Sequence, residues 1–257
     1  MKKLSVVVIT RNEEKNIRRC LEAVTWAEEI VLVDNESTDR TREIAAEFGA
    51  RIFTVGWGGY GTAKRTGVEH AEGEWILSVD ADEVVSEELA AEIKDAILAE
   101  NDYCGYTIPR KTNFLGRWIN HCGWYPDRLL RLFKKNQGNF NTAMIHEKVE
   151  LDGRVGSLRH DLLHYSYPDL ESYFIKFNRY TTLGAEAANA DGKRAGWFDI
   201  LFKPPVSFFK HYVIKRGFLD GWEGLLISFL SSTAVLIKYA KLRAMKKPSN
   251  ERLIDCE

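Results

Sequence analysis

The stretch GEWILSVDADE, residues 73–83, joins a buried strand to a group of carboxylates. Trp75 to Val79 is apolar apart from one serine, as in a strand covered on both faces of a parallel sheet. Asp80, Asp82 and Glu83 follow at the end where that strand leaves the sheet. Open α/β sheets bind ligands at this carboxyl edge. The stretch therefore predicts an α/β fold with a polar site at the end of a central strand.

The residues before this stretch alternate between apolar, β-branched runs and helical periods, which predicts a mostly parallel sheet with crossover helices. Strands are predicted over 4–9, 30–33, 51–55 and 75–79, and helices follow each of them. Asn12 is predicted to cap the first helix and Ser37 or Thr38 the second. The glycine-rich turn 56–61 opens the third. After residue 100 the alternation ends.

The later half of the chain has a different pattern. Strands are predicted over 103–109 and 129–133, separated by an aromatic loop at 114–125. From Tyr173 onward the spacing of apolar residues is helical, and Pro204-Pro205 marks a boundary within that region. The sequence therefore predicts an α/β part followed by a helical extension.

Composition and charge narrow the class of protein. With 257 residues, 45% hydrophobic and 28% charged, the chain is long enough and apolar enough to fold as one or two domains. The net charge of −1 argues against electrostatic binding of nucleic acid. From Lys203 to Lys247, however, nine Lys or Arg face two acidic residues, a local charge of +7. Such an asymmetry is expected of a protein that meets an anionic surface.

Cysteines and apolar runs bear on the compartment. The four cysteines are scattered, and no secretory leader is expected at the first residues, so we expect a reduced, cytoplasmic setting. The longest uncharged apolar run, Leu225 to Ile237, is shorter than a membrane span requires. Attachment to a membrane surface is thus expected in preference to crossing.

Several polar residues are placed for chemistry at the carboxyl edge. Asp80 and Asp82 are suited to Mg²⁺ or Mn²⁺, although an acidic turn that only caps the next helix has the same pattern. Asp34 ends the second strand and is placed either to contact a nucleoside or to form an Asx turn. Arg11 and Lys64 are candidates for binding an anion, or for ordinary surface roles.

Two common nucleotide-binding classes are excluded by missing motifs. No GxGxxG follows the first strand, so the phosphate cradle of a nicotinamide-binding Rossmann domain is absent from the sequence. No GxxxxGK[ST] P-loop occurs either. Glu147 follows His146 and is a candidate general base, although by residue type alone a surface role is more common.

Taken in order, four blocks resemble the family 2 glycosyltransferases of GT-A fold, specifically the group that contains lipopolysaccharide-core enzymes. The first three blocks are SVVVITRNEE at 5–14, VLVDNESTD at 31–39 and the stretch 73–83. The fourth runs from DRLLRLF at 127–133 through IHEK at 145–148 to HYSY at 164–167. No single block is specific, but the ordered set covers nearly the whole chain.

The resemblance implies a nucleotide-diphosphosugar donor, most often a UDP-sugar. Thr10, Arg11 and Asn12 would serve the donor pocket, Asp34 would contact the base or ribose, and Lys64 would approach the diphosphate. Asp80 would contact the ribose or sugar, and Asp82 with His164 would hold Mg²⁺ or Mn²⁺. In the family pattern the base is the second acid of a Glu-Asp pair, and the corresponding place here reads His146-Glu147. Glu147 is therefore the expected base, with Asp127 as the reserve candidate.

The domain prediction follows from the same resemblance. Residues 1–170 are expected to form the GT-A catalytic domain, with a donor-binding half at 1–100 and an acceptor half at 101–170. Residues 171–247 would form a helical, basic, membrane-proximal extension, and 248–257 a disordered tail. The expected reaction inverts the anomeric carbon and transfers the sugar to a lipopolysaccharide-core or lipid-linked acceptor at the inner face of the cytoplasmic membrane. Missing from the chain is the QxxRW signature of processive synthases.

Two alternatives belong to other classes. Asp80-Ala81-Asp82-Glu83-Val84 also fits the DxDx[TV] motif of haloacid-dehalogenase-type phosphatases, in which Asp80 would be a covalent nucleophile. That motif should follow the first strand of its domain, and here three strand-helix units precede it. The other alternative is a module that binds sugar nucleotides or membranes without catalysis.

Overall fold

The computed structural model describes residues 4–142 and 147–245. His146, the basic residues Lys246 and Lys247 and the predicted tail 248–257 lie outside the described residues. The chain divides into two compact units. The first runs to Asn113 and resumes over Tyr125–Ser166, and the second contains Phe114–Trp124 and the described residues from Tyr167 onward. The domain boundary predicted at residue 170 stays a prediction. The loop 114–124, which was predicted to be part of the catalytic domain, belongs to the second unit.

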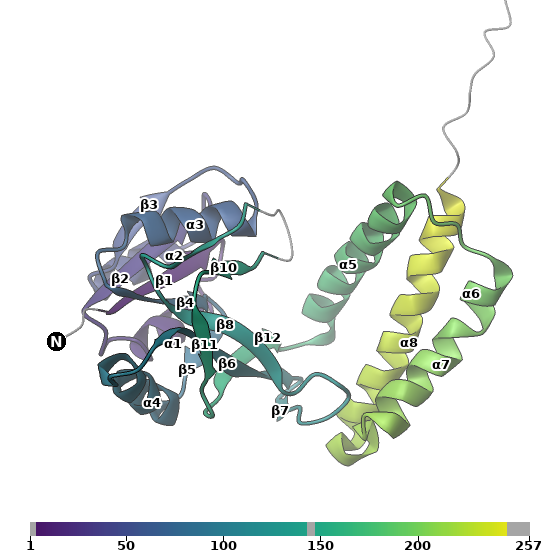
Figure 1. The fold of residues 1–257 in the computed structure, drawn as a ribbon. Coiled ribbons are helices and arrows are strands. Elements are labelled where there is room, and N and C mark those ends of the chain that lie inside the picture. Colours follow the sequence, from purple (N-terminus) through teal and green to yellow (C-terminus); the bar gives the residue numbers. More distant parts are fainter. Residues whose placement is uncertain (1–3, 143–146, 246–257) are drawn as a thin grey trace, which may run out of the picture. The chain divides into compact units, whose positions relative to one another are not determined.

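A mixed β-sheet forms the centre of the first unit (Figure 1). Its main path runs β3-β2-β1-β4-β8-β6-β12-β5. The four strands β3, β2, β1 and β4 are parallel, whereas β8 pairs antiparallel with β4 and with β6. The strands of the main path are β1 (Leu4–Thr10), β2 (Glu29–Asp34), β3 (Arg51–Thr54), β4 (Trp75–Asp80), β5 (Glu83–Val85), β6 (Tyr103–Phe114), β8 (Asp127–Lys134) and β12 (Leu162–Tyr167), and β11 (Arg154–Ser157) pairs with β6 beside this path. β9 (Gly138–Phe140) and β10 (Val149–Leu151) form a separate two-stranded antiparallel sheet. The short strand β7 (Arg117–Trp118) belongs to the second unit.

Four helices cover the two faces of this sheet (Figure 1). They are α1 (Ile17–Glu22), α2 (Thr41–Glu47), α3 (Tyr60–His70) and α4 (Glu87–Leu98). Side chains alternate along β1, so Val6 and Val8 pack in a cluster with α1, α2 and α4, while Val7 packs with α3. Burial of both faces explains why β1, β2 and β4 are mostly apolar, whereas the edge strand β3 is only partly buried. The predicted α/β fold is confirmed.

Strand register brings several polar residues to one edge of the sheet. Thr10 and Asp34 are partners across β1 and β2, and Ile9 is the partner of Asp80 across β1 and β4. Three parallel strands thus end at the same level, next to the loops that lead into the helices. The loop after β1 and the loop after β2 are joined, because Asn12 Oδ1 accepts from the backbone N–H of Thr38 at 2.8 Å.

The predicted helix caps are wrong in the first two helices. Helix α1 begins at Ile17, after Asn16, and α2 begins at Thr41, after Arg40, each without a side-chain cap. Asn12 instead binds the loop after β2, where Ser37 Oγ accepts from the backbone N–H of Asn12 at 2.9 Å. Polar residues at the ends of strands bind each other across the sheet edge here, which local helix signals do not reveal.

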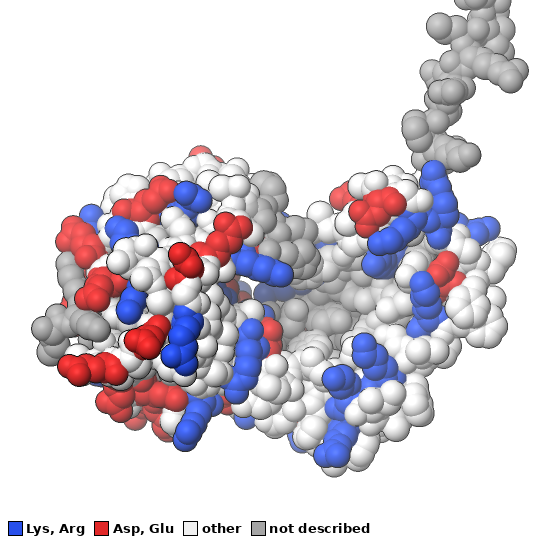
Figure 2. Space-filling model, in the orientation of Figure 1, with Lys and Arg blue, Asp and Glu red and all other residues white. Residues whose placement is uncertain are grey.

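Helices make up most of the second unit, and the predicted helical extension is confirmed. They are α5 (Leu170–Ala190), α6 (Trp197–Leu201), α7 (Lys203–Phe209), a π-helical turn η1 (Lys210–Ile214), a 3₁₀ turn η2 (Gly217–Asp220) and α8 (Gly221–Ala244). Pro204 and Pro205 lie in the first turn of α7, where their missing N–H groups cost no helix hydrogen bond. In Figure 2 this unit shows a mostly uncharged surface with groups of Lys and Arg, while Asp and Glu are frequent on the first unit.

The loop 114–124 is held inside the second unit by a buried carboxylate. Asp220 is 1% exposed and accepts hydrogen bonds from the backbone N–H groups of Asn120 and His121 at 3.2 and 2.7 Å. Cys122 donates to the carbonyl of Gly224 at 3.6 Å. The aromatic loop is therefore part of the helical unit, although the sequence predicts it as a connection between strands.

One helix, Gly217–Ala244 when η2 is included, is long and apolar enough to cross a membrane by length and composition. Its 28 residues include a window of mean hydropathy 1.5, of which 22% is buried. The uncharged run from Leu225 to Ile237 is the central part of this longer helix.

Candidate functional site

Seven charged side chains of the first unit form a continuous chain of ion pairs in which the sign of the charge alternates. We call this set the charge ladder. It consists, in order of contact, of Glu147, Lys64, Asp80, Arg131, Glu83, Arg110 and Asp127. The ladder contains both candidate bases, one at each end, and its middle lies at the carboxyl end of β4.

Asp80 is the carboxylate at the middle of the ladder. Its oxygens lie 3.0 Å from Lys64 Nζ and 2.6 Å from an Arg131 terminal nitrogen. Burial opposes its ionisation, but Arg131 and Lys64 hold the pKa of Asp80 well below its usual range. Asp80 is therefore a permanent anion, balanced by two cations that come from α3 and β8.

Lys64 comes from the second turn of α3 and is 2% exposed. Its Nζ lies 2.7 Å from Glu147 Oε1 and 5.5 Å from the centre of the Phe140 ring. A solvated helix face, the ordinary alternative for this lysine, is wrong. The lysine instead connects the end of β4 to the segment just before β10. Asp80, predicted to contact the ribose or sugar, and Glu147, the expected base, both bind its ammonium group.

The other end of the ladder is more exposed. Glu83 is fully buried and accepts from Arg131 at 3.0 Å and from Arg110 at 3.2 Å, as well as from the backbone N–H of Asp80 at 2.9 Å. Arg110 then binds Asp127, with nitrogen to oxygen distances of 2.6 and 3.1 Å. The Asp127 side chain is 41% exposed and the Glu147 side chain 16%. Both candidate bases are thus held by a cation.

Asp82 and His164, the predicted metal ligands, are brought together. Asp82 Oδ2 lies 3.3 Å from His164 Nε2, and the carbonyl of Asp82 accepts from the backbone N–H of Tyr165 at 2.9 Å. His164 Nδ1 lies 3.4 Å from Thr112 Oγ1, which orients the ring. No group of three or more His, Cys, Asp or Glu able to hold a metal occurs within residues 4–142 and 147–245.

An Asp oxygen and a His nitrogen fit a small divalent cation that takes its other ligands from elsewhere. Mg²⁺ and Mn²⁺ are usually held by one or two protein groups together with phosphate oxygens and water. The pair Asp82 and His164 provides such a partial set of ligands, and the ladder lies beside it in the sequence at Asp80 and Glu83. The residues therefore fit a metal that arrives with a diphosphate.

The ends of β1 and β2 hold two buried polar atoms that lack a partner. Asp34 is fully buried; its Oδ2 accepts from the backbone N–H of Ser37 at 3.0 Å and lies 3.7 Å from Arg42. Its Oδ1 has no hydrogen-bond partner among the described residues, and neither has the hydroxyl of Thr10, its register partner. Buried polar atoms are rarely left unpaired. The Asp34 carboxylate thus binds the loop that follows it through one oxygen and keeps the other oxygen available. Arg11, next to Thr10, is exposed.

Arg131, Glu83 and Arg110 were not predicted as site residues, although Glu83 and Arg131 lie within the quoted blocks. Arg131 is 4% exposed and lies on β8 between two leucines. A single charge inside the apolar run LLRLF is the sequence signal that was available, because a buried charge requires a partner. The carboxylates that Arg131 meets depend on strand order. β8 lies beside β4 in the sheet, although Asp80 and Arg131 are 51 positions apart in the sequence.

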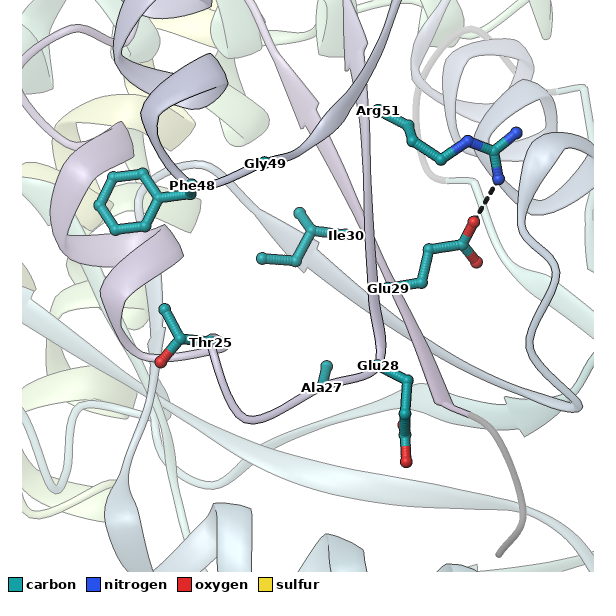
Figure 3. A pocket seen from close by; sticks show the side chains of 8 residues that line it. All are labelled: Thr25, Ala27, Glu28, Glu29, Ile30, Phe48, Gly49 and Arg51. Carbon is teal, nitrogen blue, oxygen red and sulfur yellow. Dashed lines mark hydrogen bonds and ion pairs between the residues drawn. The ribbon is translucent and has the colours of Figure 1, made fainter.

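A pocket of about 230 Å³ lies away from these residues, near the N-terminal ends of β2 and β3 (Figure 3). Arg51 and Glu29 form an ion pair there, and Phe48 and Ile30 provide apolar walls. None of the predicted site residues lines it. The chemistry of the carboxyl edge, and not the volume of this pocket, therefore locates the candidate site.

Comparison with known proteins gives a consistent set of relatives. The family described as Glycosyl transferase family 2 matches residues 5–149. An uncharacterized glycosyltransferase of Rickettsia typhi is 30% identical over 261 residues, which covers 97% of this chain and 89% of the relative. The lipopolysaccharide core biosynthesis glycosyltransferase LpsC of Rhizobium meliloti is 27% identical over 251 residues, covering 92% and 93%.

Solved structures are more distant. Residues 1–349 of S. aureus TarS in complex with UDP-GlcNAc match with a TM-score of 0.47 and 16% identity, over 94% of this chain and 90% of that one. Glucosyl-3-phosphoglycerate synthase of Mycobacterium tuberculosis, in complex with Mn²⁺, UDP and glucosyl-3-phosphoglycerate, matches with a TM-score of 0.36 and 22% identity, over 45% of each chain.

Proposed function

Since this chain belongs to glycosyltransferase family 2, we propose that it transfers a sugar, with inversion, from a UDP-sugar such as UDP-glucose to a hydroxyl of a lipopolysaccharide-core or lipid-linked acceptor. The observation that carries the proposal is the meeting of Asp82 and His164 at 3.3 Å beside the charge ladder, at the carboxyl edge of the sheet. Family membership sets aside the phosphatase alternative and the module without catalysis.

The nucleoside would bind at the ends of β1 and β2. The unpaired Oδ1 of Asp34 is an acceptor for a base N–H or a ribose hydroxyl, and the unpaired Thr10 hydroxyl is both donor and acceptor. Asn12 shapes the same edge through its bonds to the loop after β2, and Arg11 is exposed next to it. A bound nucleoside would satisfy buried atoms that the described residues leave unsatisfied, which supports this placement.

The diphosphate would bind near Lys64, Asp82 and His164. When bound by Asp82 and His164, Mg²⁺ or Mn²⁺ supplies positive charge that stabilises a departing diphosphate. Lys64 contributes charge from within the protein, and because it is buried its ammonium group is weakly screened by water. Asp80 keeps Lys64 and Arg131 in place and would contact the ribose or sugar.

In the transfer step a carboxylate takes the proton of the acceptor hydroxyl as that oxygen attacks the anomeric carbon. The new carbon–oxygen bond forms on the face opposite the UDP, whose bond to the sugar breaks, and the anomeric configuration inverts. We assign Glu147 as the base that accepts this proton. It lies 2.7 Å from Lys64, the lysine expected beside the diphosphate. Asp127, held by Arg110 at the exposed end of the ladder, is the reserve.

The acceptor and the location are inferred from relatives and charge. LpsC of Rhizobium meliloti is named for lipopolysaccharide core biosynthesis. The basic residues of the helical unit suit an anionic bilayer. We therefore place the enzyme in the cytoplasm, attached to the inner face of the cytoplasmic membrane, where a lipid-linked acceptor would be available.

Titration calorimetry with UDP tests the donor and metal sites. We expect UDP binding that requires Mn²⁺. The affinity should fall at least about tenfold in Asp82→Ala, because this variant lacks one of the two proposed metal ligands. Glu43→Ala, which removes a carboxylate that is 72% exposed on α2, is the matched control and should bind like the unaltered chain. Absence of UDP binding with or without metal would refute the uridine donor, and full binding by Asp82→Ala would refute the metal assignment.

Hydrolysis of UDP-glucose, with water as acceptor, tests the base. We expect Glu147→Gln to lower the turnover number by about 10²–10⁴-fold while leaving UDP affinity within a few fold. Asp127→Asn is the matched variant, because it also neutralises an acid held by a cation of the ladder. Full turnover in Glu147→Gln together with loss in Asp127→Asn would transfer the role to Asp127.

A further inference from the structure

Exposed apolar side chains form a row along α6, α7 and η1. They recur at spacings of three and four residues, which places them on one side of successive helical turns. The rings of Phe198 and Phe202 stack with their centres 5.0 Å apart. We call this set the apolar row, and its members, which are 43–66% exposed, are Phe198, Phe202, Val206, Phe209 and Val213.

The other side of α7 packs within its own unit. Pro204 is buried, and its carbonyl accepts from Ser232 Oγ of α8 at 2.8 Å. Lys203 Nζ donates to the hydroxyl of Tyr239 at 2.8 Å and lies 2.6 Å from Asp199. The contacts with α8 therefore use one side of the helix, and the apolar row lies on the side that the described residues of its own unit leave exposed.

Cations follow directly on the apolar row. Lys210, Lys215 and Arg216 are all exposed. Between Pro204 and Gly217 the sequence contains no Asp or Glu. Solvent-facing Phe beside Lys and Arg is the composition of helices that lie in the headgroup region of a membrane, where rings enter the acyl boundary and cations meet phosphates.

We propose that the apolar row enters the acyl boundary of an anionic bilayer, with α7 lying along the membrane surface. This inference rests on the membrane location proposed above and names the surface responsible for it. A second copy of the chain is a less suitable occupant, because self-association through the row would bring Lys210, Lys215 and Arg216 close to the same charges of the partner. Lipid phosphates complement these charges.

The charges of the long C-terminal helix favour lying on the membrane over crossing it. Asp220 and Glu223 stand at its start, and Lys238 and Lys241 near its end. The uncharged part between them, residues 224–237, spans about 21 Å at 1.5 Å per residue. The hydrocarbon core is about 30 Å thick. Ser228 of this helix is fully buried, and its hydroxyl donates to the carbonyl of Gly224 at 2.7 Å.

Flotation of the full-length protein with lipid vesicles tests this inference. We expect it to float with vesicles of phosphatidylglycerol and phosphatidylethanolamine in equal amounts. Phe209→Ser should weaken the partition by about tenfold, because one buried aromatic ring is lost from the lipid. Leu98→Ser on α4 removes another apolar side chain, 54% exposed, in the first unit, and should change nothing.

A charge variant separates the two parts of the interaction. Lys210→Gln combined with Lys215→Gln should weaken flotation with the anionic vesicles and leave the weak binding to phosphatidylcholine vesicles unchanged. High salt should remove the difference between this variant and the unaltered chain, because salt screens the contribution of the cations. Equal flotation of the charge variant and the unaltered chain on anionic vesicles at low salt would refute the role of these cations.

Three other outcomes would overturn the proposal. Undiminished flotation of Phe209→Ser would do so. A Phe209→Ser protein that, like the unaltered chain, dissolves only in detergent would also do so, because that behaviour indicates a helix that crosses the membrane. A dimer in light scattering without lipid that Phe209→Ser dissociates would assign the row to a second copy. Hydrolysis of UDP-glucose in the same lipid-free samples keeps the two proposals apart: activity without flotation refutes only the membrane surface, and flotation without activity refutes only the proposed function.

Discussion

Arg131 is the residue on which the balance of charge in the site depends. It is nearly inaccessible to water and lies 2.6 Å from Asp80 and 3.0 Å from Glu83. Burial lowers the pKa of a guanidinium, but Asp80 and Glu83 raise the pKa of Arg131 above its usual value. The cation is therefore permanent, and it is paired with two carboxylates, the fully buried Glu83 and the partly buried Asp80.

Replacing this cation should destabilise the first unit. We expect Arg131→Met to lower the free energy of unfolding by up to about 3–5 kcal/mol, because it removes the cation that Asp80 and the fully buried Glu83 share and leaves them only Lys64 and Arg110. Urea unfolding measures this change. Arg40→Gln, which breaks an ion pair between side chains that are 71% and 72% exposed, should cost less than about 1 kcal/mol. An Arg131→Met chain as stable as the Arg40→Gln chain would contradict the ladder's structural role.

At the scale of single elements, α3 owes its position to a glycine. A Cβ atom added to Gly67 would lie 2.3 Å from Val7 Cγ1 and 3.1 Å from Val33 Cγ2, so the helix rests directly on β1 and β2. Gly67 lies three residues after Lys64 on the same helix. The close approach of α3 to the sheet thus sets where the ammonium group of Lys64 meets Asp80 and Glu147.

A methyl group at this position should displace the helix. We expect Gly67→Ala to cost about 1–3 kcal/mol of stability, as overpacking does, and to lower the hydrolysis of UDP-glucose because Lys64 moves with the helix. Thermal unfolding and donor hydrolysis measure the two effects. Gly56→Ala is the matched control, since a Cβ there meets nothing within 4 Å, and both quantities should stay close to those of the unaltered chain. Equal behaviour of the two variants would show that α3 tolerates a shift.

In the second unit, Asp220 is the corresponding fixed point. Its two oxygens accept from Asn120 and His121, and His121 Nδ1 lies 3.0 Å from Oδ1. Asp220→Ala should cost about 1–3 kcal/mol, because two backbone N–H groups of the loop lose the buried carboxylate that accepts from them. Asp220→Asn keeps one oxygen and should cost less. Hydrogen exchange of the loop amides checks this expectation, and unchanged protection in Asp220→Ala would contradict it.

For the whole molecule, buried thiols in both units predict loss of stability in alkali. Burial, followed by the charges of Glu83, Asp82 and Asp80, raises the pKa of Cys20 well above its usual 9.0. Burial, with a further contribution from Asp220, raises the pKa of Cys122 to about 11. Between pH 9 and 11 the unfolded chain gives up the Cys122 proton and the folded chain keeps it, so unfolding releases a proton and stability falls as pH rises.

Urea unfolding between pH 8 and 11 measures this dependence. We expect the free energy of unfolding to fall across this window, and less steeply in Cys122→Ala, which has no thiol to titrate there. Below pH 9 the contribution of the thiol should be fully present, so the slope there should be the same in both chains. Parallel curves for the two chains up to pH 11 would contradict the raised pKa of Cys122.

The predictions from sequence succeeded where local pattern and burial coincide. Continuous apolar runs identified the central parallel strands, because a strand covered on both faces has few polar positions. The carboxyl edge was predicted for the same reason, since Asp34, Asp80 and Asp82 follow such runs directly. The caps predicted for the first two helices failed, because Asn12 and Ser37 have partners 25 or more residues away and not in their own helices.

The chain by itself thus determined its family, its α/β class and most of the polar groups of the candidate site. Only the tertiary structure decided how these groups are paired. Arg131 meets Asp80 because the strand order puts β8 beside β4, and Glu147 meets Lys64 because α3 packs closely on the sheet through Gly67. A strand pattern gives the face and the end of each residue, but electrostatic pairing depends on distances between segments remote in sequence, and those are set by sheet order and packing.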